Sequence, residues 1–113
     1  MKEFKFDYDE ENDDLFIYLE GAFSDGAVEL GDLVLDFDSK GNLVAMEIIN
    51  ASTFFSKLVS GVFEISQIKS LEVEIVNFRN MSALQLKIST PLQKYFQTIL
   101  IPRIVQESPA LLN

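Results

Sequence analysis

The stretch from Leu33 to Ile49, LVLDFDSKGNLVAMEII, holds two apolar segments separated by a short polar turn. Short runs of apolar residues bounded by turn residues are typical of β-strands. We therefore expect Leu33–Phe37 and Leu43–Ile49 to be two strands of an antiparallel hairpin. Gly41 supports this interpretation, because it can take the positive φ that a tight hairpin with a bulge requires.

The register of this hairpin decides where the carboxylate of Glu47 lies. If Asp38 and Asn42 close the turn, Leu33 lies opposite Glu47, and the carboxylate points to an otherwise apolar side. Burial without a partner is unfavourable and raises the pKa of a carboxyl group. Two roles remain open for Glu47: a general acid/base or recognition carboxylate, or a structural acid bonded to main-chain N–H groups or a nearby cation.

Further strands are expected on both sides of the hairpin. In the first half, alternation or apolar runs predict strands at Phe4–Tyr8 and Leu15–Leu19, with a short segment, Ala27–Leu30, inside a glycine-punctuated loop. In the second half, the same criteria predict strands at Leu71–Phe78, Ala83–Ile88 and Tyr95–Ile101, with Pro102 at a strand end or an edge position.

Helical spacing occurs only between these two groups of strands. Ser52 is a suitable N-cap for a helix over Thr53–Ser60, and a second short helical turn is expected within Val62–Lys69. The sequence thus predicts one α+β domain over residues 1–113, mainly an antiparallel sheet of about seven strands. Its parts are a four-strand half (1–52), one or two short helices (53–69), a three-strand meander (70–104) and a loose tail (105–113).

Composition restricts the chemistry. The 113 residues include no Cys and no His, so thiolate chemistry, disulfides and imidazole catalysis are excluded. The formal net charge is −9, with 14 Asp/Glu and 3 Lys/Arg in residues 1–52 but 4 and 6 in residues 53–113. This balance disfavours nucleic-acid binding and would suit a basic partner. The N-terminus does not read as a signal peptide and no apolar run is long enough for a membrane span, so we expect a cytoplasmic protein.

Two acidic patterns could hold a cation. Asp36, Asp38, Gly41 and Glu47 match positions 1, 3, 6 and 12 of a calcium-binding EF-hand loop. However, Lys40 stands where an oxygen donor is needed, and both flanks read as strands rather than helices, so the hairpin is the simpler interpretation. The second pattern is a run of six carboxylates, which an exposed turn between strands also explains: Asp7, Asp9, Glu10, Glu11, Asp13 and Asp14.

Three motifs in the first half resemble a known family. These are the opening at residues 6–19 (FDYDEENDDLFIYL), the hairpin at residues 35–44 (LDFDSKGNLV) and the exit at residues 46–52 (MEIINAS). Together they are similar to a small prokaryotic family, domain of unknown function 2283. Met46 departs from the Gly usual there. The resemblance implies a small β-rich fold without established catalytic residues. It also implies that the chain is one of the small partners encoded in operon pairs that resemble toxin–antitoxin modules.

The residues carry no catalytic signature, so we expect a protein that is not an enzyme and needs no cofactor or metal. The leading hypothesis is an interaction domain that forms a homodimer, because strand edges must be paired or blocked. The alternative is an antitoxin-like or regulatory acidic protein that sequesters a basic partner, and a carboxylate enzyme is third. The candidate recognition residues are Glu47, Asp36, Asp38, Asp9 and Asp14.

Overall fold

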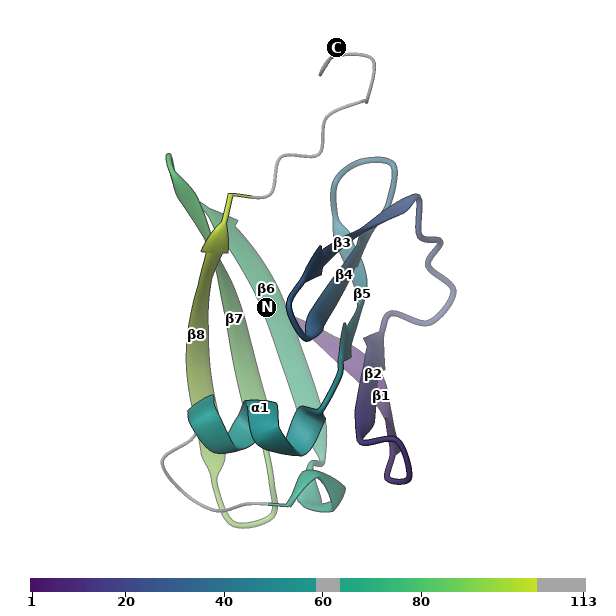
Figure 1. Ribbon diagram of the computed structural model, residues 1–113, viewed down its shortest axis with the longest axis vertical. Helices are drawn as coiled ribbons and strands as arrows, with labels where there is room; N and C mark the ends of the chain where they lie inside the picture. Colours follow the sequence, from purple (N-terminus) through teal and green to yellow (C-terminus); the bar gives the residue numbers. More distant parts are fainter. Residues whose placement is uncertain (59–63, 104–113) are drawn as a thin grey trace.

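The computed structural model describes residues 1–58 and 64–103, and these contain eight strands, one α-helix and one 3-10 turn (Figure 1). Alternating apolar residues produce most of the strands, and a short helical stretch connects the two groups. In chain order the elements are β1 (Lys2–Asp9), β2 (Asp14–Tyr18), β3 (Gly26–Leu30), β4 (Leu33–Phe37), β5 (Leu43–Ile48), α1 (Ala51–Leu58), η1 (Ile65–Gln67), β6 (Ser70–Asn77), β7 (Met81–Ser89) and β8 (Lys94–Pro102).

All eight strands belong to one antiparallel sheet in the order β3-β4-β5-β2-β1-β6-β7-β8. Strand β1 joins the two halves, because Lys2–Phe4 pairs with β6 and Lys5–Asp9 pairs with β2. The sheet curls into a half-barrel whose two halves face each other, and α1 lies across one end (Figure 1). No helix among the described residues is long and apolar enough to cross a membrane.

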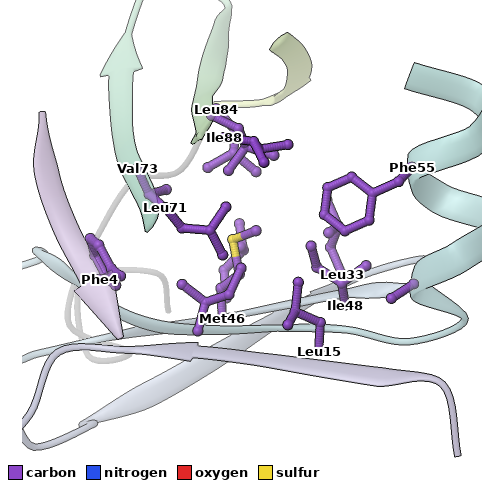
Figure 2. Close-up of a cluster of buried hydrophobic side chains, with 14 of the residues drawn as sticks. Phe4, Leu15, Leu33, Met46, Ile48, Phe55, Leu71, Val73, Leu84 and Ile88 are labelled. Carbon is purple, nitrogen blue, oxygen red and sulfur yellow. The ribbon is translucent and has the colours of Figure 1, made fainter. Parts of the chain in front are cut away.

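The core lies between the two half-sheets. Figure 2 shows side chains from β1, β2, β4 and β5 converging with side chains from β6, β7 and α1. Leu15, Leu35, Ile48, Leu71 and Leu84 are each 0% exposed. Because successive strand residues point to opposite faces, each half-sheet also presents an outer face away from this core.

The expected mainly antiparallel α+β architecture is confirmed, but the described residues form eight strands rather than seven. The additional strand is β3, which was expected to be a short segment inside a loop. It pairs with β4 from Leu30 opposite Leu33 to Gly26 opposite Phe37. A two-residue connection, Gly31-Asp32, makes this hairpin possible, since Gly31 has a φ of +61°.

The helix begins earlier than expected. It starts at Ala51 rather than Thr53, so Ser52 lies inside the helix and is not its N-cap. The expected end at Ser60 lies outside the described residues, as does the expected tail from residue 105. In the Val62–Lys69 segment, a short helical turn is present at Ile65–Gln67, and residues 62–63 lie outside the described residues.

The β4–β5 register differs from the expected one by one residue. The turn closes as expected, with the Asp38 N–H donating to the Asn42 carbonyl at 2.9 Å. However, a bulge next to Asp36 and Phe37 inserts Val44, so that Val34 rather than Leu33 lies opposite Glu47. A one-residue shift moves a side chain to the other face of a sheet. The prediction that Glu47 points to the apolar side is therefore wrong.

Candidate functional site

The outer face of the β1–β5 half carries most of the candidate residues. The pairing registers place one row of side chains side by side across five strands. From β3 to β1 this row is Glu29, Val34, Glu47, Phe16 and Asp7. We call this row, together with the neighbouring Asp14, Asp36 and Tyr18, the acidic face.

Glu47 lies at the centre of the acidic face, between Val34 on β4 and Phe16 on β2. Partial burial raises the pKa of the Glu47 carboxyl above 4.5, and the negative charge of Asp14, its hydrogen bond to Asp14 and the charge of Asp36 raise it further. Three of the candidate carboxylates are therefore electrostatically coupled. Glu47 therefore takes up a proton more readily than an isolated glutamate.

Asp9 is a candidate with a structural role at the start of the β1–β2 turn. It lies opposite Asp14, and its carboxylate accepts bonds from Asn12, at 3.2 Å from the main-chain N–H and 2.8 Å from the side-chain amide. The side-chain bond contributes most to a pKa of Asp9 below its ordinary value, and the main-chain bond from Asn12 lowers it further. Asp9 is therefore occupied with holding the turn.

Asp38 also has a structural role, at the tip of the β4–β5 hairpin. Its carboxylate accepts the N–H groups of Lys40 and Asn42 at 2.9 and 2.8 Å. The Asn42 main-chain bond is the largest reason that the pKa of Asp38 lies below its usual value. The flanks of this loop are strands, which is the arrangement that the hairpin interpretation predicts and an EF-hand lacks.

The described residues contain no cluster of three or more acidic groups arranged to hold a metal ion. Asp36 and Asp38 lie on either side of the bulge, one on the acidic face and one at the turn. The sequence spacing that suggested calcium binding is thus the spacing of a bulged hairpin.

The sequence reasoning missed the role of Asp13. This residue has a φ of +54°, and its carboxylate accepts the Tyr8 hydroxyl at 2.5 Å and the Ser52 hydroxyl at 2.6 Å. It also accepts the Ser52 N–H at 3.1 Å, while its carbonyl accepts the Ala51 N–H at 2.9 Å. A carboxylate at the first turn of a helix satisfies unpaired N–H groups, so Asp13 performs the capping that was expected of Ser52.

The electrostatics of Asp13 and Tyr8 reflect these bonds. Burial alone would raise the pKa of Asp13, but the hydrogen bonds from Ser52 and Tyr8 outweigh it and hold the pKa below its ordinary value. The same bond to Asp13, with burial second, raises the pKa of Tyr8 to about 12. The ionised form of the Asp13 carboxylate is therefore stabilised, and its bonds tie the β1–β2 turn to α1.

The β6–β8 half has a second surface whose residues were not predicted from the sequence. Strand β8 lies at the edge of the sheet and pairs with β7 along all of its nine residues. On its outer face, Phe96 is 65% exposed and Leu100 is 62% exposed. We call β8 with these two side chains the β8 edge. The Lys87 ammonium lies 5.6 Å from the Phe96 ring centre and pairs with Glu72 at 3.1 Å.

A cavity of about 400 Å³ opens between the β4–β5 hairpin and β6. Its apolar lining includes Phe4, Phe37 and Val73, while Lys2 and Glu74 are its charged lining residues.

Comparison with known proteins agrees with the resemblance of the first half. The model of the family described as "Protein of unknown function (DUF2283)" matches residues 5–52. An uncharacterized protein of Methanocaldococcus jannaschii is 50% identical over 52 residues, which are 46% of this chain and 45% of that protein. The chain therefore aligns with about half of this relative's length. No solved structure matches significantly.

The expected resemblance to this family is confirmed for residues 5–52. The matched segment contains β2–β5 and the Lys5–Asp9 part of β1, which pairs with β2, and it ends at Ser52. Both partners of the Asp13–Ser52 contact lie inside it.

Proposed function

We propose that this protein is a non-catalytic interaction domain that forms a homodimer through the β8 edge. The observation that carries this proposal is a nine-residue strand that has no strand partner on one side among residues 1–58 and 64–103, and that carries two large exposed apolar side chains, Phe96 and Leu100. An unpaired strand offers a row of main-chain donors and acceptors to another strand. Exposed apolar groups beside such a row favour burial against a partner.

Charge also supports the β8 edge as the contact surface. At a net charge of −9, two copies of the chain repel each other, so a contact is most favourable where acids are absent. No Asp or Glu occurs between Ile75 and Arg103, whereas residues 1–52 hold 14 of them. The β8 edge is therefore the part of the sheet where the mutual repulsion is weakest.

The opposite edge of the sheet differs in both respects. Strand β3 has five residues, and the fourth of them is Glu29. Short, charged edges are a common way in which proteins prevent edge-to-edge association. The contrast between the two edges supports β8, rather than β3, as the side that pairs.

The proposal is tested by sedimentation equilibrium of the full chain from about 5 to 200 µM, a range that covers typical weak homodimers. We expect a mass of twice 12.8 kDa in the upper part of this range. Leu100→Glu should weaken the dimer at least about tenfold, because an unpaired carboxylate would be desolvated in the contact. The matched control is Phe23→Glu, since Phe23 is 86% exposed and lies outside the β8 edge.

A monomeric mass throughout the concentration range would overturn the proposal. An equal loss of association in Leu100→Glu and Phe23→Glu would also contradict it, because the effect would then follow from added charge alone. Circular dichroism of each variant establishes that the fold is retained.

A second candidate function is binding of a basic protein by the acidic face. The observation that favours it is that Asp7 and Glu47 lie on either side of Phe16, which is 41% exposed, in a row that continues through Val34 to Glu29. An open face that combines carboxylates with an aromatic ring suits the Lys or Arg side chains of a cationic partner.

This candidate is tested with a defined cationic peptide, such as an oligomer of eight lysines, by fluorescence anisotropy at two salt concentrations. The triple variant Asp7→Asn, Asp36→Asn, Glu47→Gln should reduce binding more than a control that neutralises the turn residues Glu10 and Glu11. If both variants bind equally well at equal salt, the acidic face is not a recognition surface.

A further inference from the structure

The pairing of β8 with β7 determines which residues of β8 direct their main-chain N–H and C=O groups outward from the sheet. At the connecting turn, the Thr90 N–H donates to the Gln93 carbonyl at 2.9 Å, so these two residues form a bonded pair. Opposite residues in an antiparallel ladder alternate between bonded and non-bonded pairs. Even-numbered residues of β8 therefore direct their N–H and C=O groups away from β7, to the outer edge of the described sheet.

The side chains of β8 are arranged symmetrically about its middle residue. Strand β8 runs from Lys94 to Pro102, and its centre is Thr98. Phe96 and Leu100, the two large exposed side chains, lie two positions before and two positions after this centre. When a strand pairs antiparallel with its own copy, the residue before the centre meets the residue after it.

We infer that two copies of this chain pair antiparallel along β8 with the two-fold axis at Thr98, an inference that rests on the self-association proposed above. In this register Thr98 lies opposite Thr98 of the second copy, and Phe96 lies opposite Leu100 of the second copy. Both exposed apolar side chains then pack against each other on the outer face, once on each side of the axis. On the inner face Gln97 lies opposite Ile99.

Other registers fit less well. Pairing centred at Gln97 places the exposed Phe96 opposite Thr98 and Leu100 opposite Lys94, so neither apolar side chain meets the other. Centres further from the middle leave part of β8 without a strand partner. The register at Thr98 engages all nine residues, and only Pro102 at the strand end lacks an N–H to donate.

The second copy extends the sheet of the first across the contact. Lys94 lies at the strand end, so Lys94 of one copy and Lys94 of the other are separated by about eight residue spacings, or roughly 26 Å. Their repulsion is therefore small under physiological salt. The contact joins a long acid-free strand to an identical one, and it leaves the acidic faces at the far ends of the extended sheet.

The absence of cysteine from the chain makes the register directly measurable. Thr98→Cys introduces a single thiol, and across the axis its Cα should lie about 5.5 Å from its counterpart. This separation is within the range for a disulfide. Under mild oxidation we expect Thr98→Cys to form covalent dimers in high yield, with a fold confirmed by circular dichroism.

Phe96→Cys and Leu100→Cys provide an independent pair of variants. Alone, each should cross-link poorly, because Phe96 of one copy and Phe96 of the other are about 13 Å apart, beyond the roughly 7 Å limit for a disulfide. Mixed in equal amounts, the two variants should form the mixed covalent dimer. Efficient cross-linking of either variant alone, or none in the mixture and in Thr98→Cys, overturns the register.

The same measurements separate the register from the proposed function. If the unmodified chain sediments as a dimer but neither Thr98→Cys nor the mixture cross-links, the register is wrong and self-association stands. If the unmodified chain is monomeric at 200 µM, both the register and the proposed homodimer are wrong.

Discussion

The two halves of this sheet have similar inner faces and different outer faces. Toward the core, β1–β5 and β6–β8 both present apolar side chains that are nearly inaccessible to solvent, such as Leu15 and Ile48 in the first half and Leu71 and Ile88 in the second. On the outside, the first half presents a central glutamate between carboxylates, whereas the second presents exposed Phe96 and Leu100 on an edge without acids. The core therefore cannot distinguish the roles of the two halves, but the outer surfaces can.

Because the inner faces are similar and the outer faces differ, we expect folding to depend on both halves and association with other molecules to depend on the outer face of one half. Residues 5–52, which match a family model, include the acidic face and the Asp13 contact with α1. The β8 edge lies outside the matched segment. We therefore expect changes in the core to affect both halves alike, and changes on the outside to affect only one.

The largest expected effect comes from matched cavities in the two halves. Leu35→Ala in β4 and Leu84→Ala in β7 each remove a side chain that is 0% exposed. Each should lower the free energy of unfolding by about 3 kcal/mol, through lost burial and the cavity left behind. Urea unfolding followed by fluorescence and by circular dichroism should give one coincident transition in both variants. Separate transitions would show that the halves are independent domains.

The next effect is confined to the first half. Asp13→Ala removes the acceptors of the Tyr8 and Ser52 hydroxyls and of the Ser52 N–H. We expect a loss of about 2–3 kcal/mol at pH 7, because hydrogen bonds to a charged group are stronger than neutral ones. Asp13→Asn is the control, since Asn tolerates the positive φ and keeps one acceptor, and its loss should be smaller.

The difference in unfolding free energy between wild type and Asp13→Ala should change with pH in a definite direction. The folded-state pKa of Asp13 lies below its ordinary value of 3.8, so its contribution to stability is present above that value and lost as the pH falls through the folded-state pKa. The gap between wild type and Asp13→Ala should therefore narrow as the pH falls below about 4. A gap of constant size from pH 7 to pH 3 would contradict the role of the ionised carboxylate.

A smaller effect compares one ion pair from each half. Lys87 and Glu72 are both about one quarter exposed and lie 3.1 Å apart, and Lys87 also contacts the Phe96 ring. Lys87→Met should cost about 0.5–1 kcal/mol by thermal unfolding. Lys5 and Glu20 form a pair whose side chains are more than half exposed. Lys5→Met should leave stability unchanged within error, and equal losses in both variants would show that exposure does not matter here.

The smallest effect is a gain in stability. Burial and neighbouring carboxylates raise the pKa of Glu47 above 4.5, so folding disfavours its ionised form. The contribution of Glu47 to stability is therefore most favourable below pH 4.5 and is lost as the pH rises through its folded-state pKa. Glu47→Gln should raise the free energy of unfolding at pH 7 by roughly 0.5 kcal/mol, and this gain should vanish below pH 4. A destabilised variant would indicate that Glu47 is bonded in its ionised form.

The sequence was sufficient for most elements but not for the faces they present. Alternation located β1, β6 and β7, and Gly41 located the β4–β5 turn, where its φ is +83°. The bulge at Val44 could not be found in this way, because Leu43 and Val44 are both apolar and either could be the inward residue. Without the bulge, the expected register placed Glu47 on the wrong face.

The Asp13 contact was missed for a different reason. Asp13 and Ser52 are 39 positions apart, so neither alternation nor capping patterns relate them. A local pattern made Ser52 the better N-cap candidate. In the structure, the carboxylate that accepts the N–H of the first helical turn is Asp13, from the β1–β2 turn. Of the candidate residues, Asp14, Asp36 and Glu47 are brought together, while Asp9 and Asp38 hold separate turns.

The position of β1 has a consequence for local opening. Strands at chain ends usually fray, and their amides exchange with solvent quickly. Here the first part of β1, Lys2–Phe4, pairs with β6 and the second part, Lys5–Asp9, pairs with β2, so the detachment of β1 would separate the two half-sheets. The amide protons of Phe4, which lies opposite Leu71, and of Asp7, which lies opposite Phe16, should therefore exchange about as slowly as those of the central strands, although both residues lie near Met1. In hydrogen-exchange terms, the first strand belongs to the last part of the molecule to open.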